Sequence, residues 1–105
     1  MAETYCAIQV SQRLIGGKWN LVVLWHLRGG SRFFGELKRA VGAISQKALA
    51  DAVRDLEAGG LISRTVLPER PPRVSYALTP LGRSLEPVIE AIERWAADHR
   101  SELDG

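Results

Sequence analysis

The sequence has one cysteine, no long run of apolar residues and no recognisable motif of a catalytic site. The single cysteine, Cys6, excludes an internal disulfide framework and a cysteine-rich zinc site, and a lone thiol is typical of a reducing compartment. No stretch approaches the roughly 20 apolar residues of a membrane-spanning helix, and residues 1–5 lack the basic flank and apolar run of a signal peptide. We therefore expect a cytoplasmic protein that has no membrane partner.

The sequence also lacks the motifs that are typical of catalytic and phosphate-binding sites. There is no glycine-rich phosphate loop, no Ser/His/Asp or Cys/His arrangement, and no cluster of carboxylates suited to acid and base roles. Neither His26 nor His99 has a partner at a metal-ligand spacing, so we expect no metal site. The sequence thus predicts a protein that is not an enzyme and needs no cofactor.

The charges are unevenly distributed, although the formal net charge is only +2. Between Arg13 and Leu78, eleven lysines and arginines stand against five acidic residues, whereas residues 79–105 hold three against six. A basic middle followed by an acidic end indicates a surface that faces a polyanion. A solvated mixed surface would have the same composition, so charge leaves both interpretations open.

Four helices are predicted before a β-hairpin, in one domain whose 46% hydrophobic content is ample for a packed core. The first covers about residues 6–15, and the second lies in the strongly apolar segment 18–27. Apolar residues recur with helical spacing in the third, from Phe34 to Val41. The fourth begins after Ser45, a good N-cap, and ends at Gly59-Gly60.

Strand-like residues follow at 61–67 and 73–78, separated by the proline-rich segment 68–72, which predicts a hairpin with a stiff, basic tip. Thr79-Pro80 then predicts a further helix that extends to about Arg100. We expect Pro87 to bend this helix or to end its first part.

This order of elements is the winged helix-turn-helix pattern, mainly α with a small β-hairpin, and it predicts a DNA-binding core at about residues 17–78. In that fold the fourth helix enters the major groove, and the hairpin tip reaches the minor groove or phosphates. At the start of this helix, Gln46 can pair with adenine and Lys47 with guanine, whereas Arg54, two turns further along, is placed to contact the DNA backbone. The candidate DNA contacts are Ser45, Gln46, Lys47, Arg54, Arg70, Arg73 and Lys18, the last being equally well explained as a surface lysine.

The final helix predicts a homodimer. Its apolar stripe continues beyond what the small core can cover, so we expect a second copy to bury it, with help from the first helix. The dimerisation helices are then about residues 6–15 and 79–100, and two-fold symmetry predicts an inverted-repeat operator. The predicted interface residues are Leu85, Val88, Ile89, Ile92 and Trp95. Trp19, Trp25 and Trp95 either pack in the core or interface or line a small-molecule pocket at the dimer junction.

Five groups of residues also resemble a known family. They are Ile15-Gly16-Gly17-Lys18-Trp19; Phe34-Gly35-Glu36-Leu37; Ile44-Ser45-Gln46-Lys47 with Leu49, Leu56-Glu57 and Gly60-Leu61; Pro71-Pro72-Arg73-Val74; and Tyr76-Ala77-Leu78-Thr79-Pro80-Leu81-Gly82. In this order and spacing they resemble the HxlR family of bacterial regulators, relatives of MarR, over Cys6 to Trp95.

The resemblance implies a winged-helix homodimer that binds an operator and regulates transcription. It also implies that Cys6 is a candidate sensor of oxidants or electrophiles, although a lone cysteine at a helix start also suits a small packed residue. Two positions depart from the family, since Ala7 replaces a frequent proline and Phe33 a frequent basic residue. The alternative function is a winged helix that only binds proteins, which should expose apolar residues on its fourth helix and hairpin tip.

Overall fold

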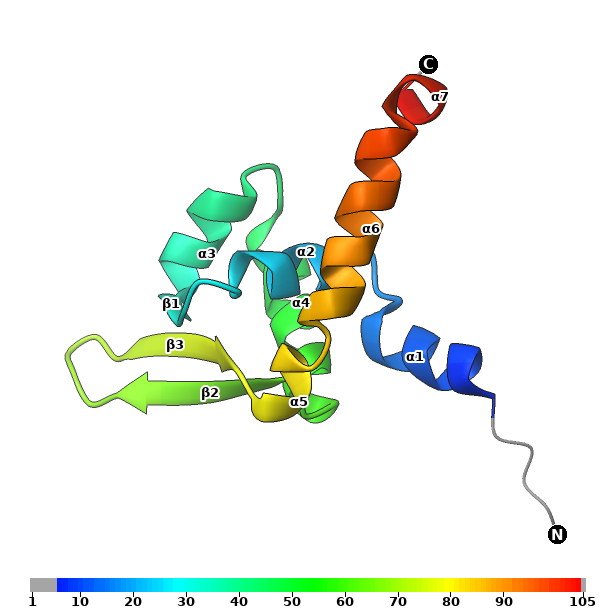
Figure 1. The fold of residues 1–105 in the computed structure, drawn as a ribbon. Coiled ribbons are helices and arrows are strands. Elements are labelled where there is room, and N and C mark those ends of the chain that lie inside the picture. Colours follow the sequence, from blue (N-terminus) through cyan, green and yellow to red (C-terminus); the bar gives the residue numbers. More distant parts are fainter. Residues whose placement is uncertain (1–5, 105) are drawn as a thin grey trace, which may run out of the picture.

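The computed structural model describes residues 6–104, in which helices pack at the inner end of a small antiparallel sheet whose hairpin projects away from them (Figure 1). The elements are α1 (Ala7–Ile15), α2 (Asn20–His26), β1 (Arg32–Phe33), α3 (Phe34–Val41), α4 (Gln46–Ala58), β2 (Ile62–Leu67), β3 (Arg73–Leu78), α5 (Pro80–Arg83), α6 (Glu86–Asp98) and α7 (Arg100–Asp104). The predicted fold class is confirmed. None of the helices in this range is long and apolar enough to cross a membrane.

The core is built mainly on α2, which explains why this segment is apolar on all sides. The helix packs against α3, α4 and α6 at once, and its Val23 and Leu24 are fully buried. A helix with neighbours on several sides buries apolar residues around much of its surface, and the exposed side of α2 also carries apolar residues, Val22 and Trp25, so the sequence shows no amphipathic period. The other fully buried large side chains come from α3, α4 and the start of the wing: Leu37, Leu49, Leu56, Leu61 and Ile62, with Leu27 just after α2.

Capping residues define both ends of α4. The Ser45 hydroxyl accepts a hydrogen bond from the backbone N–H of Ala48 at 3.0 Å, as the sequence predicts. At the other end Gly60 has a φ of 79°, and the N–H of Leu61 donates to the carbonyl of Leu56. This left-handed ending satisfies the last carbonyls and turns the chain directly into β2.

The sheet has three strands in the order β1, β3, β2, whereas the sequence predicts only the hairpin. Arg64 of β2 and Arg32 of β1 lie opposite Tyr76 of β3 on its two sides. Strand β1 is two residues long, too short to show the alternation that identifies a strand. Only its pairing with β3 makes it a strand.

The helix predicted from residue 80 to about residue 100 is divided into α5, α6 and α7. Pro87 lies in the first turn of α6, so the expectation that it ends the first part of the helix is confirmed. Gly82 is buried against Leu61, and a Cβ at this position would collide with the Leu61 carbonyl oxygen. Helix α5 therefore rests directly on the start of the wing.

The hairpin, α1 and α6 all project from the central helices, in three different directions (Figure 1). The radius of gyration is 15.4 Å, larger than the roughly 13 Å expected of a compact chain of this length. The projecting terminal helices thus leave side chains uncovered by the rest of the chain.

Candidate DNA-binding surface and the adjoining helix junction

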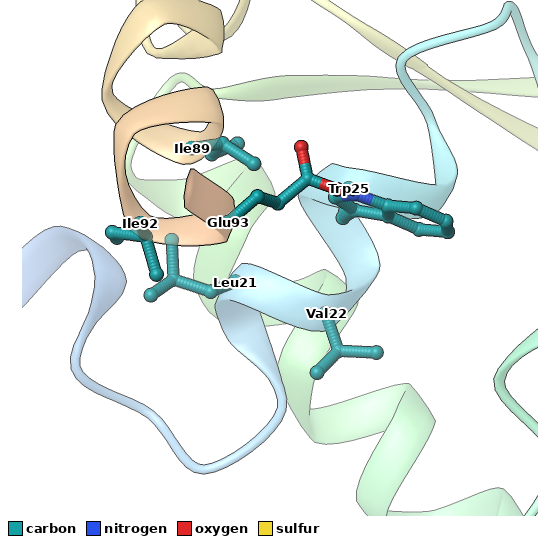
Figure 2. Close-up of a pocket in the computed structure, with 6 residues that line it drawn as sticks. All are labelled: Leu21, Val22, Trp25, Ile89, Ile92 and Glu93. Atoms are coloured by element: carbon teal, nitrogen blue, oxygen red, sulfur yellow. Dashed lines mark hydrogen bonds between the residues drawn. The ribbon is translucent and has the colours of Figure 1, made fainter. Parts of the chain in front are cut away.

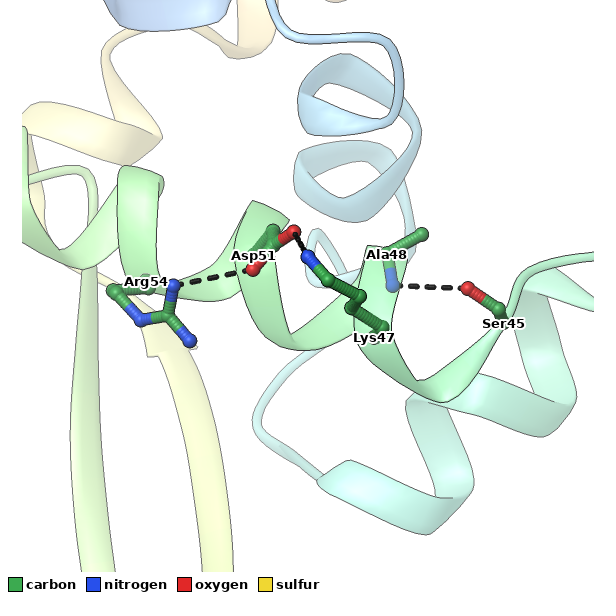
Figure 3. Close-up of polar contacts among 5 residues, drawn as sticks. All are labelled: Ser45, Lys47, Ala48, Asp51 and Arg54. Carbon is green, nitrogen blue, oxygen red and sulfur yellow. Dashed lines mark hydrogen bonds and ion pairs between the residues drawn. The ribbon is translucent and has the colours of Figure 1, made fainter.

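The first turn of α4 presents the predicted base-reading residues to solvent. Gln46 and Lys47 are both exposed and directly follow the capping residue Ser45. Figure 3 shows Ser45 and Lys47 in the first turn of the helix. The Ser45 oxygen is already an acceptor for the Ala48 N–H, so the hydroxyl has its proton left for a DNA phosphate. The turn is therefore rigid and polar.

Asp51 lies between the two predicted cationic contacts of α4 (Figure 3). Its Oδ2 accepts from Lys47 Nζ at 2.8 Å, and its Oδ1 accepts from Arg54 Nη1 at 3.1 Å. The hydrogen bond from Lys47 is the main reason why the pKa of Asp51 is below its usual value, and the Arg54 contact adds to the effect. Lys47 and Arg54 are predicted DNA contacts, whereas Asp51 is not among the predicted site residues.

The wing carries its two predicted arginines in different settings. Arg70 is exposed in the tip between β2 and β3. Arg73, at the start of β3, places its guanidinium carbon 3.6 Å from the centre of the Phe33 ring. A guanidinium stacked on an aromatic face is held in one orientation while its N–H groups remain available. Phe33, the departure from the family pattern, thus positions Arg73.

A groove of about 300 Å³ lies between α4 and the wing and contains an arginine that the sequence analysis missed. Arg54 and Glu57 contribute from α4, and Arg64 and Tyr76 from the two strands. Arg64 is exposed at the third position of β2, and alternation places it on the same side as Ile62. That alternation in the predicted strand was the signal that could have identified it.

A second groove, of about 480 Å³, separates the start of α3 from the base of the wing. Phe33, Arg39 and Arg73 contribute to its walls. The structure therefore adds Arg39 and Arg64 to the basic residues around α4 and the wing. Lys18 lies apart from these grooves, in the turn between α1 and α2, where its Nζ is 5.5 Å from the centre of the Trp19 ring.

An apolar pocket of about 210 Å³ lies between α2 and α6 (Figure 2). Leu21, Val22, Ile89 and Ile92 contribute apolar walls, and Trp25 and Glu93 contribute the remainder. The indole Nε1 of Trp25 donates to Glu93 Oε2 at 2.6 Å, and Arg28 Nη1 lies 3.3 Å from Glu93 Oε1. Of the three tryptophans, Trp25 thus lines a pocket, Trp19 packs against the core and Trp95 is exposed.

The apolar stripe predicted for the dimer interface is divided between two roles. Ile89 is only 4% exposed and belongs to the core of the chain, and Leu85 packs against that core. The remaining members, Val88, Ile92 and Trp95, are 44%, 43% and 56% exposed. Ile89 therefore has little surface left for a partner, because α6 uses this side chain to dock on α2.

The candidate sensor Cys6 and the two histidines lie outside the grooves described above. Cys6 is the N-cap residue of α1 and is partly exposed. His26 ends α2, where partial burial, with smaller effects of Arg32 and Arg28, lowers its pKa. His99 follows α6 and contacts the Trp95 carbonyl through Nδ1 at 2.9 Å. Within residues 6–104, no group of three or more His, Cys, Asp or Glu side chains is placed to hold a metal ion.

A capped helix with an exposed polar first turn, next to a basic β-hairpin, defines the winged helix-turn-helix class of DNA-binding proteins. The sequence model of the HxlR-like helix-turn-helix family matches residues 14–104. The chain belongs to this family, so the resemblance found in the sequence is confirmed.

Individual relatives agree with this assignment. An uncharacterized HTH-type transcriptional regulator of Methanothermobacter thermautotrophicus is 43% identical over 93 residues, which are 89% of this chain and 71% of the relative. A structure from Porphyromonas gingivalis W83, assigned to the MarR family of transcriptional regulators, is 37% identical with a TM-score of 0.85 and covers 92% and 95% of the two chains. The redox regulator HypR in its reduced form is 34% identical with a TM-score of 0.87, covering 94% and 98%. The predicted class, an HxlR-type transcriptional regulator, is confirmed.

Proposed function

We propose that this protein acts in the cytoplasm as a homodimeric regulator that binds an inverted-repeat operator in double-stranded DNA, without catalytic activity of its own. The exposed first turn of α4 is the observation that carries the proposal. Ser45 caps this turn, and Gln46 and Lys47 point away from the core. A side chain on a rigid helix end reaches base edges without a large loss of entropy.

The wing supplies the backbone contacts in this proposal. Arg73 is oriented by Phe33, Arg70 lies in the tip, and Arg54 and Arg64 both line the groove beside α4. Contacts to phosphate fix the register of a protein on DNA, and contacts to bases then provide the specificity. In this proposal Gln46 and Lys47 make the contacts to bases.

Dimerisation in this proposal uses the exposed part of α6. Val88, Ile92 and Trp95 form an apolar surface, and α1 adds Ile8, which is also exposed. A two-fold axis through such a surface places the two reading helices on the same side of the DNA, roughly 34–36 Å apart for half-sites one turn apart.

The alternative, a winged helix that binds only proteins, needs an apolar outer face on α4. Gln46, Lys47, Asp51 and Arg54 occupy that face instead. Oxidant sensing at Cys6 stays a prediction, supported by its partial exposure and by the description of HypR as a redox regulator.

A binding assay tests the proposal. A duplex selected from a random-sequence library by the wild-type protein serves as operator, and a scrambled duplex serves as control. We expect Gln46→Ala to cost about 1–3 kcal/mol on the selected duplex and much less on the scrambled one. Ser101→Ala, at an exposed polar residue on α7 outside the proposed DNA and dimer surfaces, is the control and should change neither value.

The salt dependence of the same assay gives a second readout. Affinity should fall with salt, with a slope of roughly −0.9 for each neutralised phosphate. A selected duplex bound no better than the scrambled one, or an affinity independent of salt, would contradict the proposed function.

A further inference from the structure

The Asp51 carboxylate occupies an unusual place for a negative charge. It lies one turn beyond Lys47 and just before Arg54, on the face of α4 that the proposed function turns toward DNA. Both of its oxygens are engaged, Oδ2 by Lys47 at 2.8 Å and Oδ1 by Arg54 at 3.1 Å. The carboxylate therefore cancels part of the positive charge at the centre of the reading face.

These ion pairs are exposed, which decides how they act when DNA arrives. The side chains of Lys47 and Arg54 are 85% and 72% exposed, and exposed pairs between helix neighbours are weak. DNA will therefore compete successfully for both cations, with base acceptors attracting Lys47 and phosphates attracting Arg54. Once the two cations turn to DNA, the carboxylate loses its partners and faces the negatively charged major groove.

An unpaired carboxylate in the major groove is unfavourable on most sequences. It is repelled by phosphates everywhere, and guanine and thymine present only acceptors or a methyl group to it in the major groove. Adenine presents its N6 amino donor beside the N7 acceptor, which repels a carboxylate, whereas cytosine presents its N4 amino donor with no acceptor of its own beside it. The penalty is therefore relieved where a cytosine lies opposite Asp51.

We infer that Asp51 is a specificity-determining residue, which weakens binding to DNA in general and favours half-sites that present a cytosine amino group to its carboxylate. This inference rests on the proposed function, since it requires α4 to enter the major groove. It assigns opposite effects to neighbouring charges of one helix: Lys47 and Arg54 raise affinity for DNA, and Asp51 raises discrimination.

The test compares Asp51→Ala with Asp55→Ala. Asp55 is an exposed aspartate on the same helix, so its replacement by alanine removes the same charge. It lies outside the two ion pairs and therefore serves as the control. Affinities are measured on the selected and scrambled duplexes, and each protein also selects its own sites from the random library. Thermal unfolding verifies that both variants are folded.

We expect Asp51→Ala to bind the scrambled duplex about fivefold more tightly at roughly 0.15 M salt, the effect of one further neutralised phosphate at a slope of about −0.9. The ratio of the two affinities should fall roughly tenfold, within the range of about 5- to 150-fold that a base contact contributes. The variant's selected sites should lose a cytosine preference at one position of each half-site. Asp55→Ala should keep the ratio and the preference.

A second variant separates charge from hydrogen bonding. Asp51→Asn removes the charge but keeps an acceptor oxygen, so it should also bind the scrambled duplex more tightly. Two outcomes would overturn this inference alone, provided that the wild type prefers the selected duplex. One is that Asp51→Ala keeps the wild-type ratio of affinities for the selected and scrambled duplexes. The other is that Asp51→Ala and Asp55→Ala lower this ratio equally. A wild-type protein that binds no duplex would overturn the proposed function and this inference with it.

Discussion

Replacing Trp95 by alanine should dissociate the proposed dimer while leaving each subunit folded. Trp95 is on α6 and is 56% exposed, and its ring centre lies 5.3 Å from that of His99. It lies outside the buried core, which contains Ile89 of the same helix. The substitution therefore removes apolar surface from the proposed interface without opening a cavity in the core.

The expected loss follows from the exposed area. A large aromatic side chain presents up to about 250 Å², so 56% of it is about 140 Å². If a partner covers half of this area, about 25 cal/mol per Å² gives about 1.7 kcal/mol for each subunit. Two-fold symmetry doubles the loss to about 3.5 kcal/mol, which weakens the dimer by roughly 300-fold.

Sedimentation velocity over a range of protein concentrations measures this change. The wild type should remain dimeric at concentrations where Trp95→Ala is monomeric, and circular dichroism should show equal helix content. Val66→Ala is the matched control, because Val66 is 46% exposed but lies on the wing, away from α6. A monomeric wild type would refute the proposed dimer, and a Trp95→Ala variant that associates like the wild type would place the interface elsewhere.

Two further predictions concern the cap of α4 and the cysteine. Ser45→Ala removes the acceptor for the Ala48 N–H and should lower the free energy of unfolding by about 1 kcal/mol, measured by urea denaturation. Ser63→Ala, which loses only a long contact of 3.5 Å, should cost less, and an equal loss would show that the cap contributes nothing special. If Cys6 senses oxidants, mild peroxide should change operator affinity in the wild type but leave Cys6→Ser unaffected, through a modified thiol or a disulfide between subunits. The same response in both proteins would assign the thiol a structural role.

Local signals in the sequence were sufficient for most of the helices and for the wing. Ser45 and Thr79 act as caps because their hydroxyls bond to N–H groups three residues away, at Ala48 and Gly82. Such contacts depend only on neighbours along the chain, and so do hydrophobic periods and the proline-rich turn. The Asp51 ion pairs are local too, since they join residues three and four apart, and the spacing alone could have indicated them.

Contacts between distant segments decided the rest. Periodicity placed Leu85, Ile89, Ile92 and Trp95 on one stripe, but a helical stripe does not show which of its members a neighbouring helix covers. Glu93 belongs to the acidic final segment, where the sequence indicates no partner for it, yet its carboxylate accepts a hydrogen bond from Trp25 at a separation of 68 residues and pairs with Arg28. Strand β1 and the groove position of Arg64 likewise depend on partners far along the chain. Sequence patterns therefore determined the elements and their polar faces, whereas only packing between elements determined which exposed side chains remain for DNA and for a second subunit.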